Sequence, residues 1–140
     1  MTPLPEVVLT DTEPNGLARM LAGLLEANLA RRPERAALLR TVVVEVDAID
    51  AAVAVTVRLH EGGVRVSNGS ATPQPHIRIR ASGHDLLALS AAPLRLGFPD
   101  PLRREGRAVL RRIASGHVRV AGMLRHPVLL SRFSRLLSAR

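Results

Sequence analysis

Hydrophobic residues near the N-terminus recur with the period of an α-helix. A stripe of aliphatic side chains, spaced i, i+3, i+4, i+7 and i+8, is formed by Leu17, Met20, Leu21, Leu24 and Leu25. This spacing places all five on one face of a helix. Asn15 stands just before the stripe and is a favoured N-cap residue, so we expect an amphipathic helix from there to about Ala30. Pro33 can begin a shorter helical piece that runs to Leu39.

After this helical region the hydrophobic period changes to two, which is typical of β-strands. Thr41–Val46 and Ala52–Leu59 alternate in this way, and the Gly-rich turn at 61–63 leads into Val64–Val66. Two strand-to-helix units follow. In the first, His76–Ala81 is a strand and Ser82 caps a helix, with Asp85 three residues later as in a capping box.

The second unit places the strand Gly116–Gly122 before an aliphatic helix that begins at Pro127. Across all strands the apolar residues fall on one side, and we expect these to face inward: Val44, Val53, Val55, Val57, Leu59, Val64, Ile77, Ile79, Val118 and Val120. The opposite side carries arginines, which we expect to face out: Arg58, Arg65, Arg78, Arg80 and Arg119. Such alternation favours a mostly antiparallel sheet with helices on one face only.

Residues 101–114 form a further helix candidate that is both basic and amphipathic. Its apolar side holds Leu102, Gly106, Val109, Leu110 and Ile113. Its polar side holds Arg103, Arg104, Arg107, Arg111 and Arg112. The apolar side suits docking on the sheet, which is the interpretation we favour. Five arginines exceed what docking requires, so peripheral contact with an anionic membrane through these arginines is the alternative.

Composition narrows the class of protein. The chain has 140 residues, about the size of one domain, and we expect a single domain over 1–140 with 1–15 as an N-terminal extension. It has no Cys, which excludes disulfides, thiolate zinc sites and thiol nucleophiles. No secretory signal or membrane-spanning run is evident, so we expect a soluble cytoplasmic protein.

The net charge of +8 lies in the second part of the chain. Residues 1–57 hold 5 Arg and 8 acidic residues, whereas residues 58–140 hold 15 Arg and 4 acidic residues. Nucleic acid is an unlikely partner, because Phe98 and Phe133 are the only aromatic residues and base-stacking platforms are therefore missing. A solvated outer face explains the sheet arginines better.

Candidate catalytic residues are few. Ser82, His84 and Asp85 are the only compact set of nucleophile, base and acid. Capping already explains Ser82 and Asp85, and adjacent helix residues point about 100° apart. The five histidines show no metal-binding spacing, and no Gly-rich phosphate loop is present. We therefore expect no catalytic residues, no metal and no cofactor.

The order of these elements resembles the sterol carrier protein type-two superfamily over residues 16–138. The resemblance is carried by Ala52–Leu59 with Gly63–Val66, by Ile77–Ile79 leading into Asp85–Leu87, and by Gly116–Gly122 before an aliphatic helix. It implies an α+β fold: a five-stranded, mainly antiparallel sheet with helices on one face that enclose an apolar tunnel. Such a tunnel would accept a sterol, a fatty acyl chain or another lipid without catalysis.

We expect the tunnel to be lined by apolar side chains that lie opposite the inward face of the sheet. These are Met20, Leu21, Leu24, Leu86, Leu89, Phe98, Val109, Ile113, Met123, Leu129 and Phe133. The function expected is that of a lipid carrier, or more narrowly of a lipid-binding accessory protein in quinone or isoprenoid metabolism. Two alternatives remain: an Arg-faced module for nucleic acid or an acidic protein, and a hydrolase or isomerase that uses His84 or His117. An oligomer is compatible with the sequence.

Overall fold

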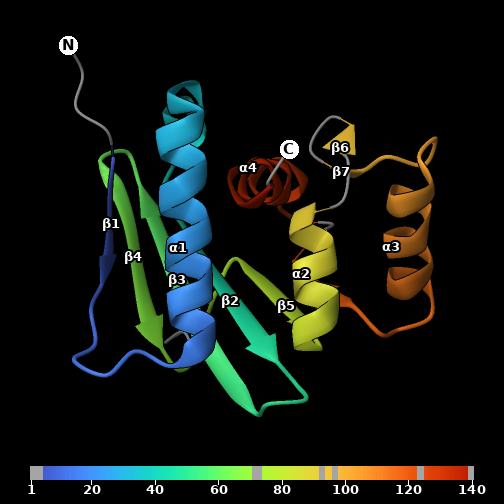
Figure 1. The fold of residues 1–140 in the computed structure, drawn as a ribbon, viewed down its shortest axis with the longest axis horizontal. Coiled ribbons are helices and arrows are strands. Elements are labelled where there is room, and N and C mark those ends of the chain that lie inside the picture. The colour runs from blue at the N-terminus through green and yellow to red at the C-terminus, as the bar shows by residue number, and fades with distance from the viewer. Residues whose placement is uncertain (1–4, 71–73, 92–93, 96–97, 123–124, 139–140) are drawn as a thin grey trace.

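The computed structural model describes residues 5–70, 74–91, 94–95, 98–122 and 125–138. Its main feature is a sheet of six strands in the order β1-β4-β3-β2-β5-β8 (Figure 1). These strands are β1 (Glu6–Leu9), β2 (Val42–Ala48), β3 (Val53–His60), β4 (Gly63–Asn68), β5 (Ile77–Ala81) and β8 (Arg119–Ala121). Two short strands, β6 (Leu94–Arg95) and β7 (Phe98–Pro99), pair separately.

The sheet is mixed, which corrects the expectation of five mainly antiparallel strands. β3 is antiparallel to β2 and β4, and β8 is antiparallel to β5. The pairs β1·β4 and β2·β5 are parallel. A period of two reports which face a side chain occupies and carries no information on the direction of the neighbouring strand. The sixth strand, β1, lies within the residues expected to be an N-terminal extension.

β1 can pair with β4 because β4 begins with a glycine. A Cβ atom at Gly63 would collide with the backbone carbonyl oxygen of Glu6, its partner in the register. Glycine at this position lets the two backbones approach closely. The edge of the sheet is therefore built by a contact between residues far apart in the sequence.

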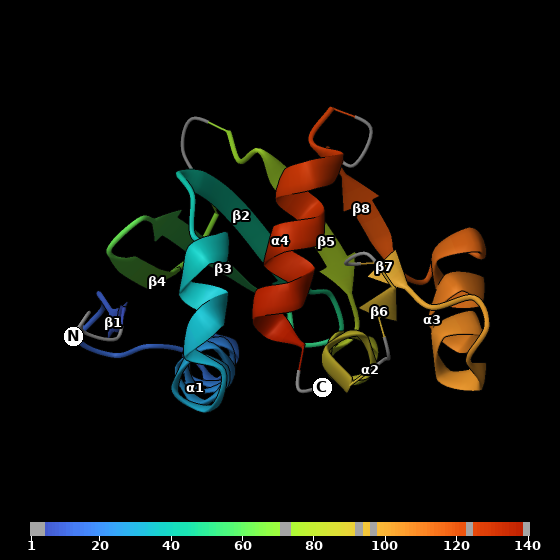
Figure 2. The same ribbon diagram turned by 90° about the horizontal axis from the view of Figure 1, so that it is seen from above.

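Three of the helices cover one face of the sheet. The helices of the described residues are α1 (Gly16–Arg31), the 3₁₀ helix η1 (Pro33–Leu38), α2 (Gly83–Ala91), α3 (Arg104–Ala114) and α4 (Pro127–Leu137). α1, α4 and α2 lie side by side over the sheet, and α3 lies beyond α2 at one end of the molecule (Figure 2). The predicted N-cap is confirmed, because the Asn15 side chain accepts a hydrogen bond from the Ala18 amide at 2.8 Å.

The hydrophobic core fills the space between these helices and the sheet. On the sheet side, the expected inward residues Val44, Val55, Val57, Val64 and Ile77 are fully buried. On the helix side, the first helix contributes its predicted stripe through Leu17, Leu21 and Leu25, and α4 contributes Leu130, Phe133 and Leu136. The alternation in the sequence therefore predicted correctly which face of the sheet the helices cover.

The opposite face of the sheet is charged, as the alternation predicted. Arg58 and Arg65 are direct cross-strand neighbours and both are exposed. β2 places two acidic residues on this face, each in an ion pair with an arginine of β5. Arg78 Nε lies 2.9 Å from Glu45 Oε2, and Arg80 Nε lies 3.1 Å from Asp47 Oδ2. Glu45 is only 1% exposed, so this face contains a buried carboxylate.

Candidate ligand-binding site

An apolar cavity of about 200 Å³ lies between the sheet and the helices. Four helices contribute to its wall, together with β2, β5 and β8 of the main sheet and Pro99 of β7. The lining residues are Met20, Leu21, Leu24, Val46, Ile79, Leu86, Leu89, Ser90, Pro99, Leu110, Ile113, Val120, Leu130, Phe133, Ser134 and Leu137. Ser90 and Ser134 are the only polar residues among them. Such a surface can bind an apolar molecule by burial, and it offers little that would carry out chemistry.

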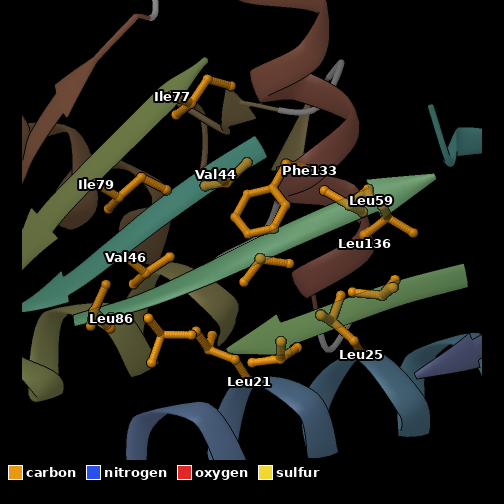
Figure 3. Close-up of a cluster of buried hydrophobic side chains, with 14 of the residues drawn as sticks. Leu21, Leu25, Val44, Val46, Leu59, Ile77, Ile79, Leu86, Phe133 and Leu136 are labelled. Carbon is orange, nitrogen blue, oxygen red and sulfur yellow. The ribbon is translucent and has the colours of Figure 1, made fainter. Parts of the chain in front are cut away.

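Figure 3 shows how part of this wall is assembled. Phe133 projects from α4 toward the strands, and Leu21 of α1 and Leu86 of α2 approach the same region from the other helices. Val46 of β2 and Ile79 of β5 are neighbours in the parallel register, so they form a continuous floor. The helical period of α1 and the strand period of β2 thus bring their apolar sides to one space.

The structure brings together seven of the eleven residues expected to line a ligand site. These seven, all on the cavity wall, are Met20, Leu21, Leu24, Leu86, Leu89, Ile113 and Phe133. Val109 is buried and lines a neighbouring groove, and Leu129 is half-buried against the core. Met123 and the side chain of Phe98 lie outside the described residues. The binding of a lipid to any of these residues stays a prediction.

A second, more open hollow lies between α2 and α3. This groove has a volume of about 670 Å³ and mixes apolar and charged residues. Its lining residues are His84, Asp85, Ala88, Leu89, Ala91, Glu105, Ala108, Val109, Arg112 and Val118. Leu89 lines both the groove and the apolar cavity. The two hollows are therefore neighbours, with this one side chain on the boundary.

An ion pair joins α2 to α3 across the groove. Arg112 Nε donates to Asp85 Oδ1 at 3.0 Å, and its Nη2 donates to Asp85 Oδ2 at 2.8 Å. Asp85 is 5% exposed. The paired hydrogen bonds from Arg112 hold the pKa of Asp85 below its usual range, and the same contact raises the pKa of Arg112. Bidentate geometry of this kind fixes orientation, so the pair sets the position of α3 relative to α2.

Removing either partner of this pair should change the dependence of stability on pH. Because the folded-state pKa of Asp85 is lowered, its contribution is present above about pH 4 and is lost as the pH falls through the folded value. Asp85→Asn should therefore flatten the acid side of the stability profile. Arg112→Gln should destabilise the folded protein more than Asp85→Asn does at pH 7, because it leaves a buried carboxylate without its partner. The loss of stability caused by Arg112→Gln should become smaller in acid, where that carboxylate is protonated.

Urea unfolding at a series of pH values from about 3 to about 8 would measure the stability profiles of both variants, because this range extends below and above the usual pKa of a carboxyl group. Arg111→Gln is the matched control, since Arg111 is exposed on the same helix. Among the described residues it takes part in no ion pair. An Arg112→Gln protein with the same pH profile as the Arg111→Gln protein would contradict this role for the pair.

The compact set of Ser82, His84 and Asp85 does not form a catalytic triad. Ser82 Oγ accepts a hydrogen bond from the Asp85 amide at 3.1 Å, which confirms that Ser82 caps α2. The Asp85 carboxylate is bound to Arg112, and His84 is exposed. His117 is also exposed, with its Nδ1 2.6 Å from Ser115 Oγ.

The part of the chain that the structure describes meets neither the requirements of a metal site nor those of a membrane-spanning helix. No group of three or more His, Cys, Asp or Glu side chains could hold a metal ion there. None of the described helices is long and apolar enough to span a membrane.

Comparison with known proteins places the fold. No family model matches the chain, and no curated protein matches it at the level of sequence. Among solved structures, a protein described as "UbiJ-SCP2 Ubiquinone synthesis protein" superposes with a TM-score of 0.60 at 19% identity. The match covers 86% of this chain and 92% of that one. The chain therefore shares an SCP2-like fold with that protein, which is the fold that the order of its sequence elements indicated.

Proposed function

We propose that the protein is a non-catalytic carrier that holds one lipid, such as a sterol or an acyl chain, in the cavity between its sheet and helices. The observation that supports this most strongly is the apolar wall, in which fourteen of the sixteen lining residues are apolar. Binding would be driven by burial of the ligand's apolar surface, at about 25 cal/mol per Å². No bond would be made or broken.

The volume of the cavity limits how much of a ligand it can enclose. At about 200 Å³ it is smaller than the roughly 300–1,000 Å³ of most small-molecule sites, so a whole lipid would extend beyond it. The groove between α2 and α3 is the adjacent space, and Leu89 separates the two. An amphipathic ligand suits this arrangement: its apolar part would enter the cavity, and its polar end would lie in the groove near His84 and Arg112. The two hollows together would then form the expected tunnel.

A narrower proposal concerns the biological role. The similar solved structure is described as a ubiquinone synthesis protein. A ubiquinone precursor consists of a polar ring and a long isoprenoid chain, which matches the combination of charged groove and apolar cavity. We therefore propose quinone or isoprenoid metabolism as the setting in which this protein carries its ligand. Mass spectrometry of lipid extracted from the freshly purified protein would identify the chemical class.

Filling the cavity should weaken ligand binding while leaving the fold intact. Leu24 lines the cavity but is only half-buried, so Leu24→Trp can place an indole there at modest cost to the core. Overpacking a site of this kind costs about 1–3 kcal/mol, so we expect the affinity for a fluorescent fatty acid to fall about tenfold or more. The measurement is a titration of delipidated protein with dansyl-undecanoic acid.

Ala27→Trp is the matched control, since it adds the same indole to an exposed position of the same helix. It should bind the probe like the parent. The natural chain has no Trp, so in each variant the new indole also reports directly on its surroundings. If the Leu24→Trp protein is folded and binds the fatty acid as tightly as the Ala27→Trp protein, the cavity is not the binding site. If the parent contains no lipid and binds no probe, the carrier function fails.

A further inference from the structure

The outward side of α3 carries exposed cationic side chains, and the one hydrogen bond found for them within the described residues is a long one, from Arg107 Nη1 to the carbonyl oxygen of Pro101 at 3.5 Å. Arg104, Arg107 and Arg111 are spaced i, i+3 and i+7, so they lie along one face of the helix, and Arg103 precedes them. All four are exposed. Within the described part of the chain none of them takes part in an ion pair. We call these four residues the arginine strip.

Every other side of α3 has a structural explanation. Gly106 and Val109 are buried, and Leu110 and Ile113 line the apolar cavity. A Cβ atom at Gly106 would collide with the backbone of Asp100, which shows how closely the first turn is packed. The apolar side of α3 therefore packs on the protein and is not free to insert into a membrane, although it packs against α2 and β7 and not, as the sequence favoured, over the main sheet. The arginine strip lies on the other side of the helix, where its guanidinium groups are exposed.

The remaining charged residues of α3 lie away from the strip. Arg112 is turned toward α2 and bound to Asp85, so it does not belong to the strip, although the sequence grouped all five arginines together. Glu105, the acidic residue of the helix, lines the groove between α2 and α3. The outward side of α3 is therefore purely cationic, and it lies at one end of the molecule, beyond α2 (Figure 2).

We propose that the arginine strip is the surface on which the protein docks on an anionic phospholipid bilayer. The proposal rests on the proposed carrier function, because α3 is also a wall of the cavity and docking would bring that wall to the source of the lipid. The attraction is between guanidinium groups and lipid phosphates, and it needs no insertion of the helix.

Two observations favour a bilayer over nucleic acid. Leu102, directly before the strip, is 69% exposed, the most exposed of the large hydrophobic residues that the structure describes. An exposed leucine beside cations suits the boundary between headgroups and acyl chains, where both are accommodated. α3 also has no aromatic residue on which a base could stack. The strip is thus chemically matched to a lipid surface.

The test compares two triple variants that remove the same charge from different faces. The strip variant, Arg104→Gln/Arg107→Gln/Arg111→Gln, removes three positive charges from the arginine strip. The sheet variant, Arg58→Gln/Arg65→Gln/Arg119→Gln, removes three positive charges from exposed positions on the outer face of the sheet. Binding is measured by co-sedimentation with phosphatidylcholine vesicles that contain phosphatidylglycerol, and with pure phosphatidylcholine vesicles.

For the strip variant we expect about a 100-fold loss of affinity for the anionic vesicles, because each arginine near such a surface contributes about fivefold. The sheet variant should bind much like the parent. Parent binding should weaken steeply with added salt and be negligible on pure phosphatidylcholine. Equal losses in the two triple variants, or full binding by the strip variant, would overturn the proposal. So would a strip variant that loses affinity for duplex DNA and keeps its affinity for vesicles.

The Leu24→Trp protein separates this proposal from the carrier function. Its cavity is filled but its arginine strip is unchanged, so it should bind anionic vesicles like the parent. Docking without any fatty-acid binding in the parent would reject the carrier function and retain the docking surface. Fatty-acid binding without docking in the parent would reject the docking surface alone.

Discussion

Replacing Phe133 with alanine should reduce the free energy of unfolding by about 3–5 kcal/mol. Phe133 is 1% exposed and is the largest fully buried side chain among those that the structure describes. It projects from α4 toward the sheet, where it contributes to both the core and the cavity wall (Figure 3). Alanine at this position would remove the ring's apolar contacts and leave a larger void, and close-packed interiors collapse around such voids only in part.

Urea unfolding followed by circular dichroism measures this loss. Val128→Ala is the control on the same helix, because Val128 is 59% exposed and its truncation should change stability by less than about 0.5 kcal/mol. A small probe such as benzene should stabilise the Phe133→Ala protein more than the parent, since apolar voids bind such molecules. A loss of stability no greater than that of Val128→Ala would show that α4 is not packed on the sheet in this way.

Local signals in the sequence predicted most of the helices and which face of the strands is buried. The stripe around Leu21 and the cap at Asn15 define α1 through contacts within a few residues, and such contacts can be read from spacing alone. The same holds for Ser82 at the start of α2. The alternation of β3 likewise indicated its buried face. These features depend on neighbours along the chain.

Features that depend on distant partners were not predictable in the same way. β1 has only four residues, and its parallel partner β4 begins 57 residues after it, so neither its length nor its period marks it as a strand. The residues that the sequence predicts for the cavity wall lie on helices and loops, whereas Val46, Ile79 and Val120 of the sheet also line the cavity. The pairing of Asp85 with Arg112 joins two helices and required the tertiary structure.

The acidic pair on the outer face of the sheet, with Glu45 buried and Asp47 half-buried, was also beyond prediction, because alternation suggested only a solvated surface there. Glu45 and Asp47 are two residues apart on β2 and share this face. Burial, and then the neighbouring Glu45, raise the pKa of Asp47, and one of its oxygens, Oδ1, accepts no hydrogen bond among the described residues. Folding thus places two carboxylates where they disfavour each other's charge. Arg78, in contact with Glu45, and the more exposed Arg80, in contact with Asp47, offset this cost.

Arg78→Gln should therefore destabilise the protein by about 3 kcal/mol at pH 7. This is the low end for a buried pair, because the Arg78 side chain is 35% exposed and water can replace part of its effect. The raised pKa of Asp47 means that the folded state favours its protonated form, a contribution present in acid and lost as the pH rises. The deficit of the Arg78→Gln protein should thus be greatest near neutral pH and smaller at about pH 4.

Two further variants test this reasoning by urea unfolding at both pH values. Arg80→Gln removes the more exposed arginine beside Asp47 and should cost no more than about 1 kcal/mol. Asp47→Asn, combined with Arg78→Gln, should recover part of the lost stability at pH 7, because it removes one of the two competing charges. If Arg78→Gln costs no more than Arg80→Gln, or if Asp47→Asn makes the Arg78→Gln protein less stable at pH 7, Arg78 does not compensate the charges of Glu45 and Asp47.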